Sequence, residues 1–373
     1  MDLNLEDRHL ELARIARQLF ESRCSLERVR ALETDETGYS PELWREMAGL
    51  DWLGLGYPRD WGGSGGGLLD LAMIYREMGR ALVPSPHLAS AVICGQTLVG
   101  EANAARAGLV ASMTEGDMIV TPALMEGSAE YGPDAIHLSA RATGHGFALQ
   151  GTKLLVPYAH VSGSLLVAAR TGTAPDGVTL FLVDAHDPSV STERMPNIAG
   201  YPLFAVTFEG LEVDADAVVG QVDHGWEILG PALDRATVLR CAEIVGAGER
   251  LLDMSVGYAQ QRAQFGRPIG QFQAVQYLCT DIAIDTHLTS LLTWQAAWLV
   301  DNAVACRREV AMAKAYGSRA AQRIVHRAHE VHAGVGFMME TDLQLFTRRA
   351  KHWEFDLGEA RYHDDAIAAA LEN

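Results

Sequence analysis

Three long runs near the C-terminal end constrain most strongly what this chain of 373 residues can fold into. In residues 226–262, 272–305 and 308–333 the apolar residues recur at helical spacing, and each run is longer than a helix of an ordinary globular domain. Long helices with wide apolar faces bury those faces against one another. The sequence therefore predicts a bundle of long helices in this part of the chain.

The part of the chain before the bundle shows two different periods. Residues 1 to about 115 have helical spacing, with a helix start at Ser40-Pro41-Glu42, where serine can cap the helix and proline suits its first position. From about residue 118 to 222, short alternating runs are typical of antiparallel strands. We predict an α+β protein with an N-terminal helical domain (1–115), a middle antiparallel β-barrel or sandwich (116–224) and a C-terminal four-helix bundle (225–373).

The composition excludes several classes of function. With a formal net charge of −18 the surface repels nucleic acid and anionic membranes, so neither is an expected partner. No run of about 18 apolar residues marks a membrane span, and no Rossmann or P-loop fingerprint is present. The five cysteines have neither metal-ligand nor disulfide spacing, and the acidic N-terminus lacks the apolar core of a signal peptide. We therefore expect a cytoplasmic protein without a metal site.

The segment QQRAQFGRPIGQFQAVQ, residues 260–276, contains more than a turn between two helices requires. An arginine offers a bidentate fork to phosphate, and Gly266 and Gly270 remove side chains where a bulky ligand passes. A helix that starts near Gln271 adds N–H donors and a positive dipole end. These residues suit a phosphate-bearing ligand, and a plain inter-helix turn with a surface arginine is the alternative that they leave open.

The order of the segments and the pattern Arg-x-x-Phe-Gly-x-x-Ile-x-x-Phe-Gln in residues 262–273 resemble the acyl-CoA dehydrogenase family of FAD-dependent flavoproteins. The resemblance runs along the whole chain and includes YPRDWGGSGGG, HGWEILGPALDRA and EVHAGVGFMMETDLQLFTRRAK. In the family this turn reaches the FAD of the neighbouring protomer. The resemblance implies that Arg262 pairs with the pyrophosphate, that Phe265 packs on the cofactor and that Gln273 hydrogen-bonds its adenylate half.

A second FAD-contacting segment of the family falls on residues 330–334. Where the family has a glutamine and paired glycines, this chain has Glu330, Ala333 and Gly334. The resemblance implies that Glu330 and Gly334 contact the cofactor, although a carboxylate beside phosphates is unfavourable unless it turns away or is protonated. A helix that ends at Gly334 with a left-handed cap is the alternative.

The implied reaction is α,β-desaturation of an acyl-CoA thioester, in which a carboxylate takes the α proton and FAD accepts the β hydrogen. The family's base is a glutamate just before a glycine, and the matching residue here is Leu357. At an alternative base position, on the first long helix of the bundle, stands Ala236. Glu243 is our candidate base, because it lies about two turns after Ala236 on the same helix face and a buried carboxyl has a raised pKa.

Other departures from the family's pattern concern the same chemistry. Asp234, Asp356 and Glu359 are further carboxylates near the two base positions. In the middle domain, ALMEGSAEYGPD (123–134) replaces the family's substrate loop, and Leu155-Val156-Pro157 replaces its Trp-Ile-Thr at the flavin edge.

Three functions stay open from the sequence. The first is an active FAD-dependent acyl-CoA dehydrogenase with a relocated base. The second is a non-catalytic or half-site subunit of a heterotetramer, as in bacterial relatives of steroid side-chain breakdown, in which a homologous subunit completes the site. The third is the same fold reused for another acyl-CoA reaction. The resemblance implies an acyl-CoA substrate, an electron-transfer flavoprotein as electron acceptor, and a homo-oligomer or a heterotetramer.

Overall fold

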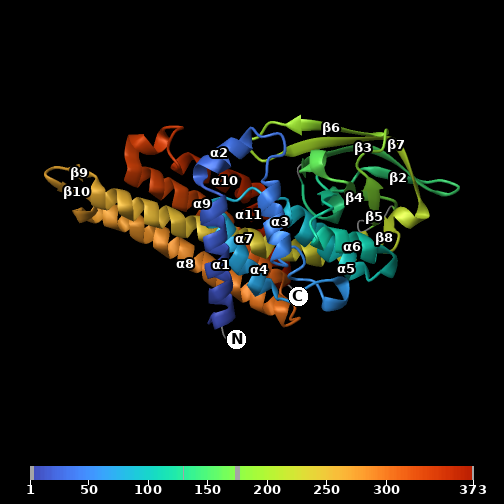
Figure 1. The fold of residues 1–373 in the computed structure, drawn as a ribbon, viewed down its shortest axis with the longest axis horizontal. Coiled ribbons are helices and arrows are strands. Elements are labelled where there is room, and N and C mark those ends of the chain that lie inside the picture. The colour runs from blue at the N-terminus through green and yellow to red at the C-terminus, as the bar shows by residue number, and fades with distance from the viewer. Residues whose placement is uncertain (1–3, 129, 173–176, 372–373) are drawn as a thin grey trace. The chain divides into compact units, whose positions relative to one another are not determined.

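The computed structural model describes residues 4–128, 130–172 and 177–371, and the chain folds into two units (Figure 1). The helices of the predicted N-terminal domain are shared between both units, and the predicted boundaries at residues 115 and 224 stay a prediction. The first unit contains Met1–Arg30, Gly67–Val83 and Thr237–Asn373, and the second contains Ala31–Gly66 and Pro84–Ala236.

The first unit is helical, and its longest helices are the three predicted runs. They are α7 (Gly225–Gln261), which enters from the second unit, α8 (Gln273–Asp301) and α9 (Arg307–His332). Helix α9 packs against α8, α10 and α11, while α4 packs against α1 and α8. The predicted bundle is confirmed, because α8 and α9 pack on each other and most apolar residues of α7 and α9 are buried. Helix α8 buries only part of its apolar surface, since Tyr277, Ile284, Leu288 and Leu291 are exposed. The other helices are α1 (Asp7–Arg23), α2 (Leu26–Glu33, which continues into the second unit), α4 (Leu68–Ala81), α10 (Leu343–Phe355) and α11 (Ala360–Leu371).

Two glycines set the distance between α4 and α7. A Cβ on Gly79 of α4 would overlap the backbone of Glu243, and a Cβ on Gly246 of α7 would overlap the carbonyl of Arg76. The two backbones are therefore in direct contact, and this contact covers one side of the middle of α7. Beside the crossing, the Arg76 guanidinium donates to both carboxylate oxygens of Glu249 at 3.0 Å.

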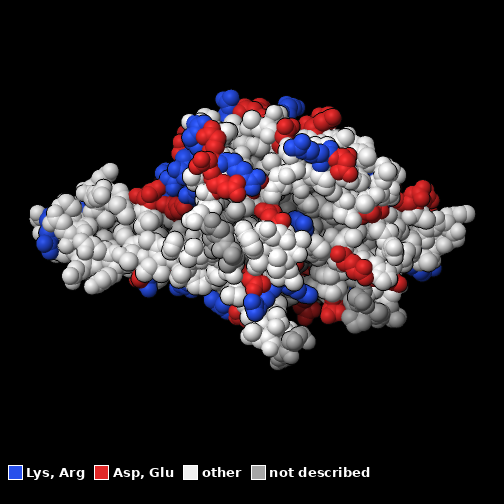
Figure 2. All heavy atoms as spheres, turned by 90° about the horizontal axis from the view of Figure 1, so that it is seen from below, with Lys and Arg blue, Asp and Glu red and all other residues white. Residues whose placement is uncertain are grey.

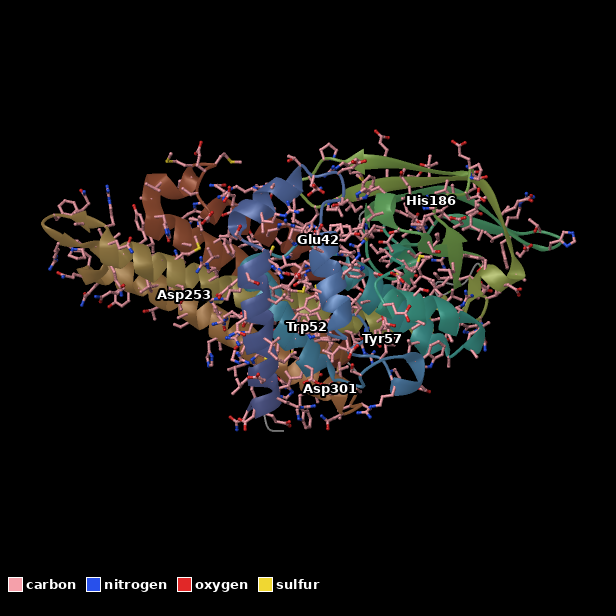
Figure 3. The ribbon with its side chains drawn as sticks, viewed as in Figure 1. Glu42, Trp52, Tyr57, His186, Asp253 and Asp301 are labelled. Carbon is pink, nitrogen blue, oxygen red and sulfur yellow. The ribbon has the colours of Figure 1, made fainter. Side chains whose placement is uncertain are left out.

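The start of α4 is capped from α8. The carboxylate of Asp301, labelled in Figure 3, accepts hydrogen bonds from the backbone N–H groups of Leu68 at 2.5 Å and Leu69 at 3.0 Å. A carboxylate at a helix N-terminus accepts hydrogen bonds from the free N–H donors and interacts favourably with the positive end of the helix dipole. This cap fixes the register of α4 against the end of α8.

The second unit contains the sheet, ordered β6-β7-β3-β2-β4-β5-β8, with β1 beside β4. Most pairs are antiparallel, as predicted, but β1 and β2 pair with β4 in parallel, so the sheet is mixed. The parallel pairs arise because β1 and β2 reach β4 through long connections that include other strands. The strands are β1 (Val120–Ala123), β2 (Ser139–Ala142), β3 (Gly146–Pro157), β4 (Ser164–Arg170), β5 (Val178–Asp184), β6 (Val190–Met195), β7 (Leu203–Asp214) and β8 (Val218–Val219).

Short helices complete the second unit. The predicted cap at Ser40 is confirmed, since its hydroxyl accepts from the Leu43 N–H at 3.3 Å and Pro41 occupies the first position of α3. Residues Leu88–Gly95 form a π-helix, and the Tyr57 hydroxyl donates to the Ala91 carbonyl in its wide turn at 2.5 Å. The helices are α3 (Pro41–Gly49), the π-helix η2 (Leu88–Gly95), α5 (Gln96–Glu101) and α6 (Ala107–Thr114).

Every helix in the described part of the chain falls short of the length and hydropathy that crossing a membrane requires. On the face shown in Figure 2, acidic and basic side chains are interspersed.

The glycine crossing generates a stability prediction. In Gly79→Ala the added methyl group meets the backbone of α7, and we expect the free energy of unfolding to fall by about 3 kcal/mol in chemical denaturation. Gly257→Ala is the matched control, because an added Cβ meets no atom within 4 Å there. It should raise the free energy of unfolding by about 0.5–1 kcal/mol through helix propensity. Equal effects of the two variants would contradict the crossing.

Candidate functional site

The segment between α7 and α8 forms a protruding arm, residues 262–272, at the end of the two helices where Figure 1 labels β9 and β10. Strands β9 (Ala263–Gln264) and β10 (Arg267–Pro268) pair antiparallel, with Gln264 opposite Arg267. The two residues between them, Phe265 and Gly266, have φ angles of 54° and 79°. Positive φ at both positions is the mark of a type I′ hairpin turn.

Phe265 is unfavourable for the chain in which it stands. Its side chain is 90% exposed, and a bulky residue in the left-handed region costs roughly 1–2 kcal/mol, whereas asparagine or glycine is usual at this turn position. An exposed aromatic ring and a strained backbone at one residue point to a contact beyond this chain's own fold.

Contacts within the arm fix its conformation. The Gln276 side chain donates to the Gly270 carbonyl at 2.9 Å, and the Ile269 N–H donates to the Arg262 carbonyl at 2.8 Å. The Arg267 guanidinium lies 4.2 Å from the centre of the Phe272 ring, against which Phe265 packs edge-on. The arm therefore has a defined shape.

The structure gathers the three predicted cofactor residues of this segment. Arg262 and Phe265 are exposed on the arm, and Gln273 is exposed at the first position of α8 that follows it. Arg262 continues directly from α7, since its N–H still donates to the Tyr258 carbonyl at 2.8 Å.

The second predicted cofactor segment lies beside the root of the arm. The rings of Tyr258, on the last turn of α7, and His332, at the end of α9, stack at a centroid distance of 4.6 Å. The carboxylate of Glu330 accepts from Arg327 at 2.9 Å, so its charge is paired along its own helix. Gly334 presents an open side, with no atom within 4 Å of where a Cβ would be.

The end of α9 differs from the alternative interpretation, a left-handed cap at Gly334. The helix ends at His332, and Ala333 carries the positive φ, at φ 51° and ψ −139°. The residue that replaces a glycine of the family is therefore the one whose backbone most needs glycine. The alternative cap at Gly334 is therefore wrong by one residue, because the positive φ falls on the alanine before the first glycine.

The two base positions hold apolar side chains in defined places. Leu357 follows α10 with a φ of 58°, and Ala236 is fully buried in α7. Glu243 is also buried, with its carboxylate bonded to Arg240. Burial raises the pKa of Glu243, and the Arg240 guanidinium opposes this only in part.

Arg240 and Lys314 are two buried cations that sequence reasoning missed. Arg240 donates from Nε to Asp356 at 2.9 Å, which leaves Asp356 in an ion pair. Burial disfavours the Asp356 carboxylate, but the charges of Arg240, His352 and Lys314 outweigh this and lower its pKa. The one available signal for Arg240 was that it stands with Glu243 in the mostly apolar stretch TVLRCAEIVGAG.

Lys314 fixes the chain around Leu357. Its Nζ is fully buried and donates to the carbonyls of Trp353 at 2.9 Å and Gly358 at 2.8 Å, and to the Ser318 hydroxyl at 2.8 Å. Burial lowers the pKa of Lys314 to about 8. The last carbonyls of a helix have no N–H partner within the helix, and at the end of α10 the Lys314 ammonium donates to the Trp353 carbonyl instead.

In the second unit, an ion pair ties down the segment that replaces the family's substrate loop, of which residue 129 lies outside the described residues. Glu126 accepts from the Leu138 N–H at 2.9 Å and from the buried Lys153 Nζ at 2.6 Å. At the position of the family's tryptophan, Leu155 has a positive φ of 54° and is 43% exposed.

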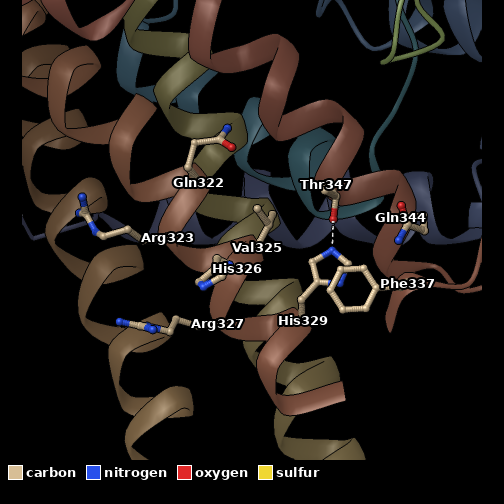
Figure 4. A pocket seen from close by; sticks show the side chains of 9 residues that line it. All are labelled: Gln322, Arg323, Val325, His326, Arg327, His329, Phe337, Gln344 and Thr347. Atoms are coloured by element: carbon tan, nitrogen blue, oxygen red, sulfur yellow. Dashed lines mark hydrogen bonds between the residues drawn. The ribbon is translucent and has the colours of Figure 1, made fainter. Parts of the chain in front are cut away.

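A groove of about 730 Å³ runs along α9, η8 (Ala333–Phe337) and α10 (Figure 4). His329 stacks on Phe337 at 4.6 Å and hydrogen-bonds Thr347 at 2.8 Å. Both arginines of the groove are already paired, Arg323 with Asp285 and Arg327 with Glu330. The lining residues are Gln322, Arg323, Val325, His326, Arg327, His329, Phe337, Gln344 and Thr347.

Comparisons with known proteins agree with the sequence resemblance. Models described as the N-terminal and C-terminal domains of acyl-CoA dehydrogenase match residues 6–116 and 223–372. Acyl-CoA dehydrogenase FadE27 of Mycobacterium tuberculosis is 32% identical over 370 residues, which cover 96% of each protein.

Two solved structures are similar over almost their whole length. A chain of the ChsE4-ChsE5 complex from Mycobacterium tuberculosis is 31% identical, with a TM-score of 0.90 and 100% and 99% of the two chains covered. A chain of a variant of the Tcur3481-Tcur3483 steroid ACAD is 30% identical, with a TM-score of 0.87 and 98% and 99% covered. The predicted fold class is confirmed.

The turn at Phe265 generates a prediction on stability. Phe265→Asn should raise the free energy of unfolding by about 1 kcal/mol, because asparagine tolerates the left-handed region. Phe265→Val is the matched variant and should lower it, since a β-branched residue tolerates this region least. Chemical denaturation measures the free energy of unfolding of both variants. A Phe265→Val variant more stable than Phe265→Asn would contradict the turn type.

Proposed function

Because the chain belongs to the acyl-CoA dehydrogenase family, we propose that it is one subunit of a heteromeric acyl-CoA dehydrogenase that provides the arm but no catalytic base of its own. The family consists of FAD-dependent oxidoreductases that act on CH–CH bonds. The flavin supplies the acceptor for the β hydrogen, and a protein carboxylate supplies the base for the α proton.

One observation supports the proposal most strongly. The arm contains a strained, exposed aromatic residue that does not stabilise this chain, while apolar residues stand at both base positions. Phe265 is strained and exposed, so its value must lie in a contact with another chain or a ligand. Leu357 and Ala236 cannot accept a proton. A chain that serves a neighbour's site but has lost its own base would show this combination.

The relatives support a complex of two kinds of subunit. The ChsE4-ChsE5 complex and the Tcur3481-Tcur3483 steroid ACAD are each named for two components, and each contains a chain similar to this one. We propose a bulky, steroid-derived acyl-CoA as the substrate of the complex and an electron-transfer flavoprotein as its electron acceptor. We propose the cytoplasm as its location, since the spacing of the five cysteines in the sequence suits neither a disulfide framework nor a metal site.

The residues of the arm fit FAD better than those of the second segment. Arg262 has an exposed guanidinium for a phosphate, Phe265 an exposed ring for a planar group, and Gln273 an exposed amide. At the second segment, the charge of Glu330 is engaged by Arg327, and Gly334 has an open side for backbone approach. In the proposed complex these five residues hold the FAD shared with the homologous subunit.

A second candidate function is an active dehydrogenase in which Glu243 is the base. Its buried carboxyl with a raised pKa favours this role. Its bond to Arg240 opposes the role, because a guanidinium stabilises the carboxylate and weakens its attraction for a proton. The half-site role therefore ranks first.

Arg262→Ala tests the proposed function directly. A bidentate arginine–phosphate contact contributes about 1.5–3 kcal/mol, so the complex purified with its homologous subunit should bind FAD at least about 10-fold more weakly. Flavin absorbance per complex and FAD titration measure this. Arg14→Ala removes an exposed arginine of α1 as a matched control and should keep full flavin content. Full flavin content in Arg262→Ala would refute the shared cofactor site.

Glu243→Gln separates the two candidates. If Glu243 is the base, turnover of the complex falls by a factor of 10³ or more, since the amide cannot accept the α proton. If the half-site role is right, turnover per flavin stays within about twofold, because Arg240 still pairs with Asp356 and the fold persists. Steady-state kinetics with an acyl-CoA substrate, normalised to bound flavin, distinguishes the two outcomes.

A further inference from the structure

One buried guanidinium joins two carboxylates, one of which belongs to the residue just before Leu357. Arg240 is 7% exposed, and its Nε and Nη2 lie 2.9 and 2.7 Å from Oδ2 of Asp356, the residue just before Leu357. Its Nη1 donates to Glu243, one turn further along α7, which is 5% exposed. These three residues form the Arg240 cluster, which ties the middle of α7 to the end of α10.

The chain on the other side of the Arg240 cluster is also fixed. Lys314 binds the carbonyls of Trp353 and Gly358, and a ring nitrogen of His363 lies 2.9 Å from the Leu357 carbonyl oxygen. The segment that carries Leu357 is therefore held by a buried ammonium, by a histidine ring and, through Asp356, by Arg240. Movement of this segment would break several of these contacts together.

The Arg240 cluster is incompatible with the work of a base. A base carboxylate must offer a free lone pair to the carbon-bound proton. Both carboxylates of the cluster already accept charge-assisted hydrogen bonds from the same guanidinium. A thioester that entered here would have to displace a buried ion pair and leave its charges unpaired, which is strongly unfavourable.

We propose that the Arg240 cluster closes this chain's own acyl-CoA site. Leu357 removes the base, and Arg240 with its two carboxylates takes the space and the polar contacts that a substrate thioester would need. This inference rests on the proposed function, since the family's base position places the site at Leu357. It also implies that restoring a glutamate at position 357 alone does not restore a substrate site.

The test counts acyl-CoA sites in the complex of this chain with its homologous subunit. The probe is a radiolabelled acyl-CoA in which sulfur replaces the β carbon, so that it cannot be desaturated. Equilibrium dialysis should give one bound probe per pair of subunits for the wild type. Arg240→Ala/Glu243→Ala opens the cluster and should give two.

A matched variant controls for the loss of a buried ion pair as such. Arg17→Ala/Glu77→Ala removes the pair between α1 and α4, in which Arg17 Nε donates to the buried Glu77 at 2.8 Å. It lies outside the Arg240 cluster and should leave the count at one. If Arg240→Ala/Glu243→Ala does not fold, Arg240→Ala/Glu243→Gln leaves no charge at position 243 and should also give two.

The outcomes separate the inference from the proposed function. A wild-type count of two would refute the half-site function itself. A wild-type count of one with a count of one in a folded, flavin-containing opened variant would overturn the closure and leave the half-site function standing. A second site in the Arg17→Ala/Glu77→Ala control would also overturn the closure, because the effect would then follow from general loosening.

Discussion

The contact between α4 and α7 through Gly79 and Gly246 is the constraint on which the first unit depends. It lets two helix backbones touch on one side of α7, while Cys241 and Ile244 lie beside Gly317 of α9, and residues 236–247 are almost completely buried. Once this stretch is buried, a charged side chain in it must find a partner or destabilise the fold. Arg240 and Glu243 satisfy that requirement together, and Arg240 extends it to Asp356 at the end of α10. Close packing of the helices therefore requires Arg240 to be paired, and its contact with Asp356 holds the segment that carries Leu357.

The arm, in contrast, contains a residue whose strain and exposure are not relieved by packing within the protomer. Its internal contacts define its shape, yet Phe265 keeps both backbone strain and exposure that these contacts do not remove. Asparagine or glycine at this position would make a better turn. Within one protomer the sequence is therefore suboptimal here, which agrees with the proposed contact of Phe265 with a ligand or another chain.

The sequence predicted the elements whose signals are local. The runs 226–262, 272–305 and 308–333 became α7, α8 and α9 within a few residues, because helical spacing reports a buried face directly. The Ser40 cap and the arm were also found, since each rests on a few neighbouring residues. Non-local features were missed. Parallel pairing of β1 with β4 depends on a crossover, and the division of the N-terminal helices between two units depends on contacts distant in sequence. Burial of Lys314 and Arg240 depends on what packs over them, which helical spacing does not reveal.

Leu357 and Phe265 both have a strained, positive φ, but their surroundings differ. Leu357 has a positive φ, but Lys314 and His363 bind the carbonyls around it, so the fold itself maintains that conformation. Phe265 has nearly the same φ and stands in the turn between the paired strands β9 and β10, but its residue surface is 90% exposed. A position that has lost its chemistry can be filled with stabilising contacts, because nothing requires it to stay open. A position that still works for another chain cannot be optimised in this way, since its partner is absent when the protomer folds. In the proposed half-site subunit, the strained and exposed Phe265 would mark the contact that the chain retains, and the well-satisfied surroundings of Leu357 would mark the catalytic role that it has lost.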